Sequence, residues 1–306
     1  MEVDIVTIEN LKYAIRRKLV MAIENTKKLI ETCLDAPQLR IDDKAFTRER
    51  TLGVKKILHF LLFRIYHSLQ LCLDKYFVGI DMLPVSKQAF SQSRKYLNPE
   101  YVRKFVDMTS ELAAQDSMMP SYNGMRLIAI DGSDIALENT PELKEAFGCS
   151  GPKKDAVTAL CSIAYGPLDN VIYDCRIDRY AADERDLAKE HVKRLLELDL
   201  GGSLLLFDRW YPSAEFMAFL YESKFQFVMR VRNKFNLEAD GIKTQGWISL
   251  KHNDKEYSVR ILKVKLNNDE TETLLTSLNQ KQLPIRNASA LYFKRWKVLN
   301  SRFFRH

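Results

Sequence analysis

Apolar residues at helical spacing dominate the first 120 residues of the chain. They recur near every third or fourth position from Ile5 to Leu34 and again from Val54 to Phe77, and few glycines or prolines interrupt them. Such spacing predicts amphipathic helices that bury one face. The second stretch runs to Gly79 and Pro84, residue types that commonly end helices. We therefore expect residues 1–120 to form a helical domain.

A further helical segment, residues 86–95, combines a small inward face with a polar outer face. Ser86 is a candidate N-cap, and Ala89 and Phe90 are expected to face inward. The side chains expected to point outward and to contact DNA are Lys87, Gln88, Arg94 and Lys95. This arrangement suits a recognition helix in a helix-turn-helix-like bundle. A plain solvated helix has the same pattern, so that alternative stays open.

From Gly124 onwards the hydrophobic pattern changes to short β-type runs. The strand candidates are Met125–Ile130, Ala156–Ala164, Asn170–Ile177, Ser203–Phe207 and Phe225–Val231. Two helices are expected between them, Asp183–Leu198, ended by Gly201-Gly202, and Pro212–Ser223, with proline in its first turn. Three strands followed by alternating helix and strand describe a mixed α/β sheet. This is the element order of a ribonuclease H-like core.

The last part of the chain alternates in β fashion before a final helix. Runs around Trp247, from Lys255 to Leu266 and from Thr271 to Leu278 predict strands. We expect a β-rich insertion over residues 232–287 that interrupts the core, whose first part is residues 121–231. Residues 288–306 would then begin the last core helix, which starts at Ala288.

Charge is spread unevenly along the chain. The net charge of the 306 residues is +7, with basic residues in excess by 4 over residues 1–120, acids in excess by 5 over 121–230, and basic residues in excess by 8 over 231–306. An acidic middle between basic ends suits a cation site flanked by phosphate-binding surfaces, although solvated surface charge without a partner would look the same.

Five cysteines without a C-x-x-C spacing favour a reduced, cytoplasmic setting without a zinc site. The most apolar stretch, Ile57–Leu73, contains His59 and Arg64, so we expect a buried helix and no membrane span.

Two aspartates stand where apolar runs end, in Ile128-Ala-Ile-Asp131-Gly-Ser and Leu206-Phe-Asp208-Arg-Trp-Tyr211-Pro-Ser. In a ribonuclease H-like core the strands that carry them are neighbours, so we expect Asp131 and Asp208 to meet. Carboxylates at strand ends can share divalent cations, and metal-assisted phosphoryl transfer on nucleic acid requires such an arrangement.

These motifs, with the start of a Tyr-x2-Arg-x3-Glu-x6-Lys signature at Tyr292 and Arg295, resemble bacterial insertion-sequence transposases of the DDE class, in particular the cut-and-paste family numbered four. The resemblance covers roughly residues 45–296. It implies that Asp131 and Asp208 are catalytic ligands of two Mg²⁺ or Mn²⁺ ions about 3.5–4 Å apart. It also implies DNA partners, both transposon ends and target, a homodimer in the synaptic complex, and a cytoplasmic, nucleoid-associated protein without membrane contact.

The signature fails where the family has its third acid. Counting from Tyr292, the glutamate should stand at position 299 and the lysine at 306, but the chain has Leu299 and His306. We hypothesise a truncated or frameshifted element copy. Since positioning supplies much of the rate in phosphoryl transfer, we predict no detectable strand cleavage by this chain alone. Glu215 and Glu222, on the helix after Asp208, are less favoured substitutes for the missing acid.

The resemblance also suggests phosphate contacts by Arg209, Tyr211, Tyr292 and Arg295, with ordinary packing as the alternative for Tyr211. Three functions remain open. The first is an active DDE transposase, the second an inactive DNA-binding remnant that blocks element ends or poisons active subunits, and the third a ribonuclease H-fold nuclease that uses another acid.

Overall fold

The computed structural model describes residues 24, 28, 31, 37–42, 44–47, 51–63, 68–153, 155–232, 235, 237–265 and 270–296. The chain divides into two compact units, Met1–Met108 and Thr109–His306. Apart from residues 24, 28 and 31, the helix expected over Ile5–Leu34 lies outside the described residues. Within the described residues no helix is both long and apolar enough to cross a bilayer.

The first unit is helical wherever it is described in regular structure. Its elements are the 3-10 turn η1 (Pro37–Leu39) and the helices α2 (Val54–Phe63), α3 (Leu69–Gly79) and α4 (Lys87–Arg94). Helix α5 (Pro99–Gln115) begins in this unit and ends in the second. A core of fully or nearly buried side chains, among them Ile57, Leu73, Phe77 and Phe90, joins α2, α3 and α4.

Serine caps set two of these helix starts. The Ser68 Oγ accepts a hydrogen bond from Leu71 N at the start of α3, and the Ser86 Oγ accepts one from Ala89 N at the start of α4. The expectation of one helix over Val54–Phe77 was wrong, because α3 has its own N-cap. On α4 only Phe90 is buried, whereas Ala89 is exposed, so the predicted inward face is narrower than expected.

The second unit is a mixed α/β fold, as predicted. Its strands are β1 (Leu127–Ala136), β2 (Cys149–Ser150), β3 (Ala156–Tyr165), β4 (Ile172–Arg179), β5 (Leu204–Phe207), β6 (Gln226–Val231), β7 (Gln245–His252), β8 (Lys255–Lys265) and β9 (Thr271–Thr276). Its helices are α6 (Pro141–Phe147), α7 (Glu184–Glu197), α8 (Ala214–Glu222), α9 (Leu237–Gly241) and α10 (Ile285–Tyr292), which continues as the 3-10 turn η2 (Phe293–Arg295).

Sheet connectivity gives this unit its ribonuclease H-like character. In the described residues one sheet runs β2-β3-β1-β5-β6-β9-β8-β7, and β4 also pairs with β3. Strand β3 is antiparallel to both β1 and β4, whereas β1, β5 and β6 are parallel. Strands β7 to β9 extend the same sheet through the β6–β9 pair. That residues 232–287 are an insertion into the core stays a prediction.

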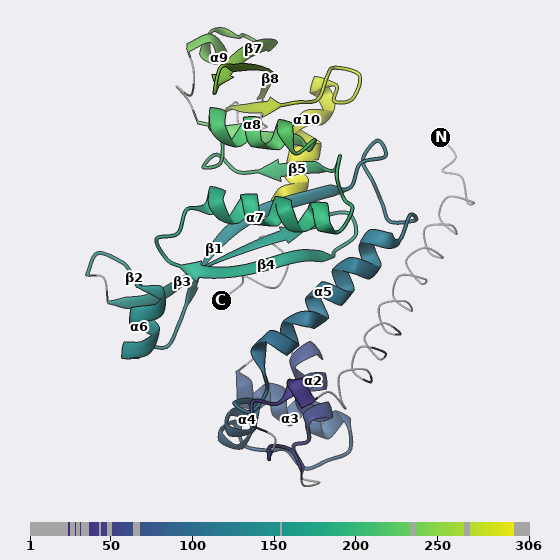
Figure 1. Cartoon of the computed structure of the whole chain (residues 1–306), viewed down its shortest axis with the longest axis vertical. Helices are drawn as coiled ribbons and strands as arrows, with labels where there is room; N and C mark the ends of the chain where they lie inside the picture. The colour runs from purple at the N-terminus through teal and green to yellow at the C-terminus, as the bar shows by residue number, and fades with distance from the viewer. Residues whose placement is uncertain are drawn as a thin grey trace. The chain divides into compact units, whose positions relative to one another are not determined.

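The two faces of the sheet are covered by different helices. Ile128 and Ile130 of β1 pack in the cluster that contains residues of α7 and α8, and Leu127 and Ala129 pack in the cluster that contains residues of α10. Figure 1 shows α7 and α8 lying along the strands of the sheet, with α10 in yellow beyond β5. Alternation along a strand therefore assigns residue 131 to the α10 face.

Several element ends differ from the sequence expectation. Strand β1 runs on to Ala136 because residues 129–136 pair with β3. Helix α7 ends before Gly201, at the C-cap Leu198, and Asp199 takes the left-handed conformation with φ 56°. Pro212 precedes the N-cap Ser213 and so lies outside α8. Helix α10 begins at Ile285, three residues before the predicted start.

Candidate active site at the ends of β1 and β5

Parallel pairing of β1 and β5 brings the two aspartates together. Leu127 pairs with Leu204 and Ala129 with Leu206, so the same register places Asp131 opposite Asp208. Asp131 is 8% exposed, and Asp208, one residue beyond the end of β5, is half-buried. The structure therefore places the two predicted site residues at one edge of the β1–β5 pair.

Arg295 lies between the two carboxylates. Its Nη1 donates a hydrogen bond of 2.8 Å to Asp131 Oδ2, and its Nη2 lies 3.9 Å from Asp208 Oδ2. The residue is 2% exposed and its guanidinium packs over the Trp296 ring at 4.7 Å. Such a buried cation reduces the repulsion between two carboxylates that face each other. In this arrangement Arg295 is committed to the aspartates, so the predicted free phosphate contact at Arg295 does not fit the structure.

Burial and neighbouring charge set the ionisation of this cluster. Burial raises the pKa of Asp131 to about 6, with Arg295 opposing the shift and Asp208 and Glu184 adding to it. Burial also raises the pKa of Glu184, and Asp208 contributes to that rise. The two shifts show that the site holds more negative charge than Arg295 balances.

Glu184 is a site residue that our sequence interpretation left as part of a capped first turn of α7. Its Oε2 would lie 2.9 Å from a Cβ built on Gly132, the residue after Asp131. Asp183 caps the helix by accepting a hydrogen bond from Arg185 N, so Glu184 is the first helical residue. The one sequence signal for its position is Gly132 itself, because only glycine leaves room beside Asp131 for this carboxylate.

Two tyrosines of the site are buried and do not face solvent. Tyr211 is 0% exposed and packs against Phe207 and Phe216. Tyr292 is also 0% exposed, in the cluster on the α10 face. The predicted phosphate contacts at these two residues do not fit their burial, and for Tyr211 the packing alternative describes the structure. Both hydroxyls are buried without a hydrogen-bond partner.

The exposed residues predicted to contact DNA fall on both units. Arg209 is exposed directly after Asp208, and Trp210 beside it is 59% exposed with the Arg232 guanidinium 3.2 Å from its ring centroid. On the first unit, α4 and its C-cap expose the four predicted residues Lys87, Gln88, Arg94 and Lys95. Their exposure is compatible with DNA contact, which stays a prediction.

The two substitutes considered for the missing acid point elsewhere. Glu215 pairs with Lys189 at 2.7 Å, and Glu222 pairs with Lys255 at 2.7 Å. Position 299, where the third acid is expected, lies outside the described residues.

Asp131 and Asp208 supply the hard carboxylate oxygens that Mg²⁺ and Mn²⁺ prefer. The unpaired Nε of Arg295 and the unpaired hydroxyls of Tyr211 and Tyr292 show that polar groups converge here without satisfying one another. In the described part of the chain no three acidic, histidine or cysteine side chains already stand at metal-binding spacing. The pair of aspartates therefore fits a divalent cation, whereas a complete ligand set is not preformed.

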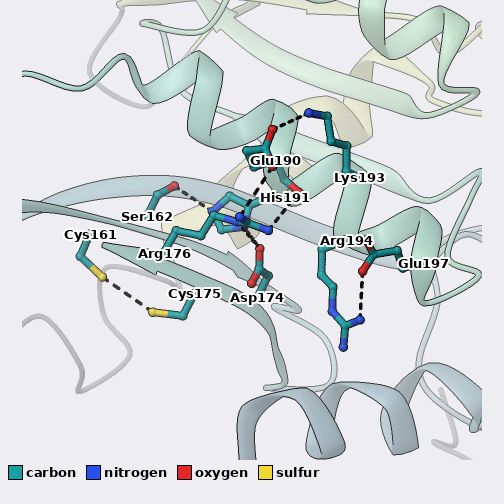
Figure 2. Close-up of polar contacts among 10 residues, drawn as sticks. All are labelled: Cys161, Ser162, Asp174, Cys175, Arg176, Glu190, His191, Lys193, Arg194 and Glu197. Carbon is teal, nitrogen blue, oxygen red and sulfur yellow. Dashed lines mark hydrogen bonds and ion pairs between the residues drawn. The ribbon is translucent and has the colours of Figure 1, made fainter. Parts of the chain in front are cut away.

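A second polar cluster lies beneath α7 and has a different role. His191 Nδ1 lies 2.7 Å from Asp174 Oδ2, and His191 Nε2 lies 3.0 Å from Ser162 Oγ (Figure 2). Arg176 Nε donates to the same Asp174 oxygen at 2.7 Å. The chain of Ser, His and Asp has the composition of a hydrolase triad, but Ser162 and His191 are 0% exposed and Asp174 is 2% exposed. No substrate reaches it, so it serves to hold α7 on β3 and β4.

A mixed sheet of this topology defines the ribonuclease H-like class of folds. The chain belongs to the transposase DDE domain family, whose model matches residues 122–298. The solved piggyBac transposase synaptic complex with hairpin DNA is similar in fold, with a TM-score of 0.50 and 11% identity over 89% of this chain and 67% of that one. Endonuclease V of Ciona intestinalis, in complex with a 24mer DNA, also matches, at a TM-score of 0.29 and 10% identity over 65% of this chain and 99% of that one. No curated protein matched.

Proposed function

We propose that the protein is a cut-and-paste transposase of the insertion-sequence type numbered four, from a bacterial element, whose strand cleavage is impaired. The family supports DNA transposition in general. The observation that carries the proposal for this chain is the convergence of Asp131 and Asp208 on Arg295 at the ends of two parallel strands.

Asp131 and Asp208 would hold Mg²⁺ or Mn²⁺. Bound cations of this kind activate the attacking oxygen and stabilise the leaving oxygen in phosphoryl transfer. The strands and the Arg295 contact fix the two carboxylates before DNA arrives, which lowers the cost of ordering them later. Arg209, exposed beside Asp208, would bind a phosphate near the cleaved bond.

Impairment is proposed because Leu299 stands where the family has its third acid. Without that carboxylate the second cation lacks an anchor, so DNA binding would persist while cleavage slows. The α4 residues Lys87, Arg94 and Lys95 would bind the phosphate backbone of the transposon ends. We expect a homodimer on paired ends.

The test uses the purified chain and DNA that carries the inverted repeats flanking its gene. Binding is measured by electrophoretic shift across a salt series, and cleavage is measured with Mg²⁺ and with Mn²⁺. We expect binding that weakens steeply with salt, no cleavage by the unmodified chain, and metal-dependent cleavage by Leu299→Glu that Asp131→Ala abolishes. Cleavage by the unmodified chain, lost in Asp131→Ala, would refute the impairment. Absence of binding to these ends would refute the proposed role on DNA.

The second candidate, an inactive remnant that blocks ends, is favoured by Leu299 in particular. It predicts that the unmodified chain, mixed in equal amount with the Leu299→Glu variant, lowers the cleavage given by that variant. Undiminished cleavage in the mixture would exclude poisoning. The nuclease alternative predicts cut ends that are never joined to target DNA.

A further inference from the structure

We infer that Glu184 is a third carboxylate ligand of a divalent cation bound at Asp131 and Asp208. The inference rests on the proposed function in one respect, namely that the two aspartates bind the cation. It goes further because Glu184 comes from the first turn of α7, whereas the third acid expected from the family motif would come from the final helix.

The approach of Glu184 to β1 is the first support. Its carboxylate atoms Oε2 and Cδ would lie 2.9 and 3.0 Å from a Cβ at position 132. A side chain at residue 132 would therefore push the carboxylate away from the strand. Glycine at this position lets Glu184 reach the backbone directly beside Asp131.

The second support is the buried hydroxyl of Tyr211. It is fully buried, it has no hydrogen-bond partner, and Glu184, Asp131 and Asp208 all act on it electrostatically. A buried hydroxyl left unpaired among three carboxylates is costly. It marks polar space between Glu184 and the two aspartates, where a cation and its water ligands would complete the bonding.

The charge balance gives the third support. Asp131, Asp208 and Glu184 carry three negative charges, and Arg295 supplies one positive charge. Glu272, which also acts on Arg295, is matched by Arg230, whose Nε lies 3.2 Å from Glu272 Oε1. The three carboxylates and Arg295 therefore leave two negative charges, which is what one divalent cation neutralises.

Binding would draw the carboxylates inward, because they do not yet stand at metal-binding spacing within the described residues. Glutamate is suited to this movement, since its carboxylate turns on three side-chain bonds. The ion expected is hard and octahedral, Mg²⁺ or Mn²⁺, held by carboxylates and completed by water.

The experiment is a titration of the intact chain with Mn²⁺ alone, followed by electron paramagnetic resonance of the free ion. Glu184→Gln is compared with Glu197→Gln, which lies on the same helix, is exposed and pairs with Arg194. We expect Glu184→Gln to weaken Mn²⁺ binding roughly 10-fold or more, and Glu197→Gln to leave it unchanged. Glu184→Asp, which keeps the charge on a shorter stem, should fall between them.

Circular dichroism and urea unfolding establish that each variant is folded, and Glu184→Asp provides the test if Glu184→Gln is not. Unchanged Mn²⁺ affinity in the folded Glu184 variants, with weakened binding in Asp131→Asn, overturns the inference and leaves the proposed function standing. Unchanged affinity in Asp131→Asn as well overturns both. Loss of affinity in Glu197→Gln equal to that in Glu184→Gln would show a general charge effect and also overturn the inference.

Discussion

Replacing Asp131 with asparagine should stabilise the cation-free protein at neutral and alkaline pH. Asp131 is 8% exposed, and burial raises the pKa of its carboxyl from the ordinary value of 3.8 to about 6. The folded state therefore holds the ionised carboxylate at a cost. Asparagine has nearly the same shape and still accepts a hydrogen bond from Arg295, but it carries no charge.

The size and sign of the effect follow from the two pKa values of Asp131. A difference of about 2 pKa units corresponds to about 3 kcal/mol in the free energy of unfolding. Because the folded-state pKa is the higher one, the folded state binds the proton more tightly, and the stability of the unmodified protein falls as pH rises from about 4 through about 6. Asp131→Asn should then be more stable by up to about 3 kcal/mol at pH 8, with no difference below pH 4.

Urea unfolding in EDTA, at intervals from pH 4 to 8, measures this difference. The matched control is Asp174→Asn. Burial alone would raise the pKa of Asp174, but the hydrogen bonds from His191 and Arg176 outweigh it and lower the pKa. That variant should therefore be less stable than the unmodified protein at pH 8, and the difference should shrink as the pH falls. If Asp131→Asn is no more stable at pH 8, or if its advantage does not depend on pH, the reasoning about the buried carboxylate is wrong.

Three further predictions test other parts of the structure. Substitution of His191 with alanine leaves buried Asp174 and Ser162 without their shared partner, and should lower the free energy of unfolding by about 2–5 kcal/mol in urea. The triple substitution of Lys87, Arg94 and Lys95 with alanine should flatten the salt dependence of DNA binding by roughly 2–3 in the slope of log K against log salt, as an electrophoretic shift series would show. Tyr211→Phe removes an unpaired buried hydroxyl and should stabilise the cation-free protein by about 1 kcal/mol, so a destabilised variant would indicate a partner for that hydroxyl.

The parts of the fold that depend on local pattern were predictable from the sequence. The apolar run before Asp208 and the acidic cap at Asp183 place β5 and the start of α7 within one residue of their observed positions. The approach of Asp131 to Asp208 was predictable because parallel neighbouring strands end at the same edge of a sheet.

What the sequence did not reveal depends on contacts between distant residues. Arg295 and Asp131 are 164 positions apart, and no periodicity links them. The extension of β1 to Ala136 depends on pairing with β3, so the polar residues after Asp131 gave no strand signal. The start of a new helix at Ser68 was hidden by continuous apolar spacing on both sides of it.

The site shows why stability and cation binding should change in opposite directions. Asp131 and Glu184 both have raised pKa values because burial and mutual repulsion outweigh the single charge of Arg295. Without a cation these carboxylates destabilise the fold, so neutralising Asp131 should stabilise it. With a saturating cation the same charges become ligands, and binding stabilises the folded state in proportion to the excess of cation over its dissociation constant. Asp131→Asn should therefore lose the stabilisation that Mn²⁺ gives the unmodified chain, and this reversal of rank on adding Mn²⁺ distinguishes a cation site from a cluster of acids that merely opposes folding.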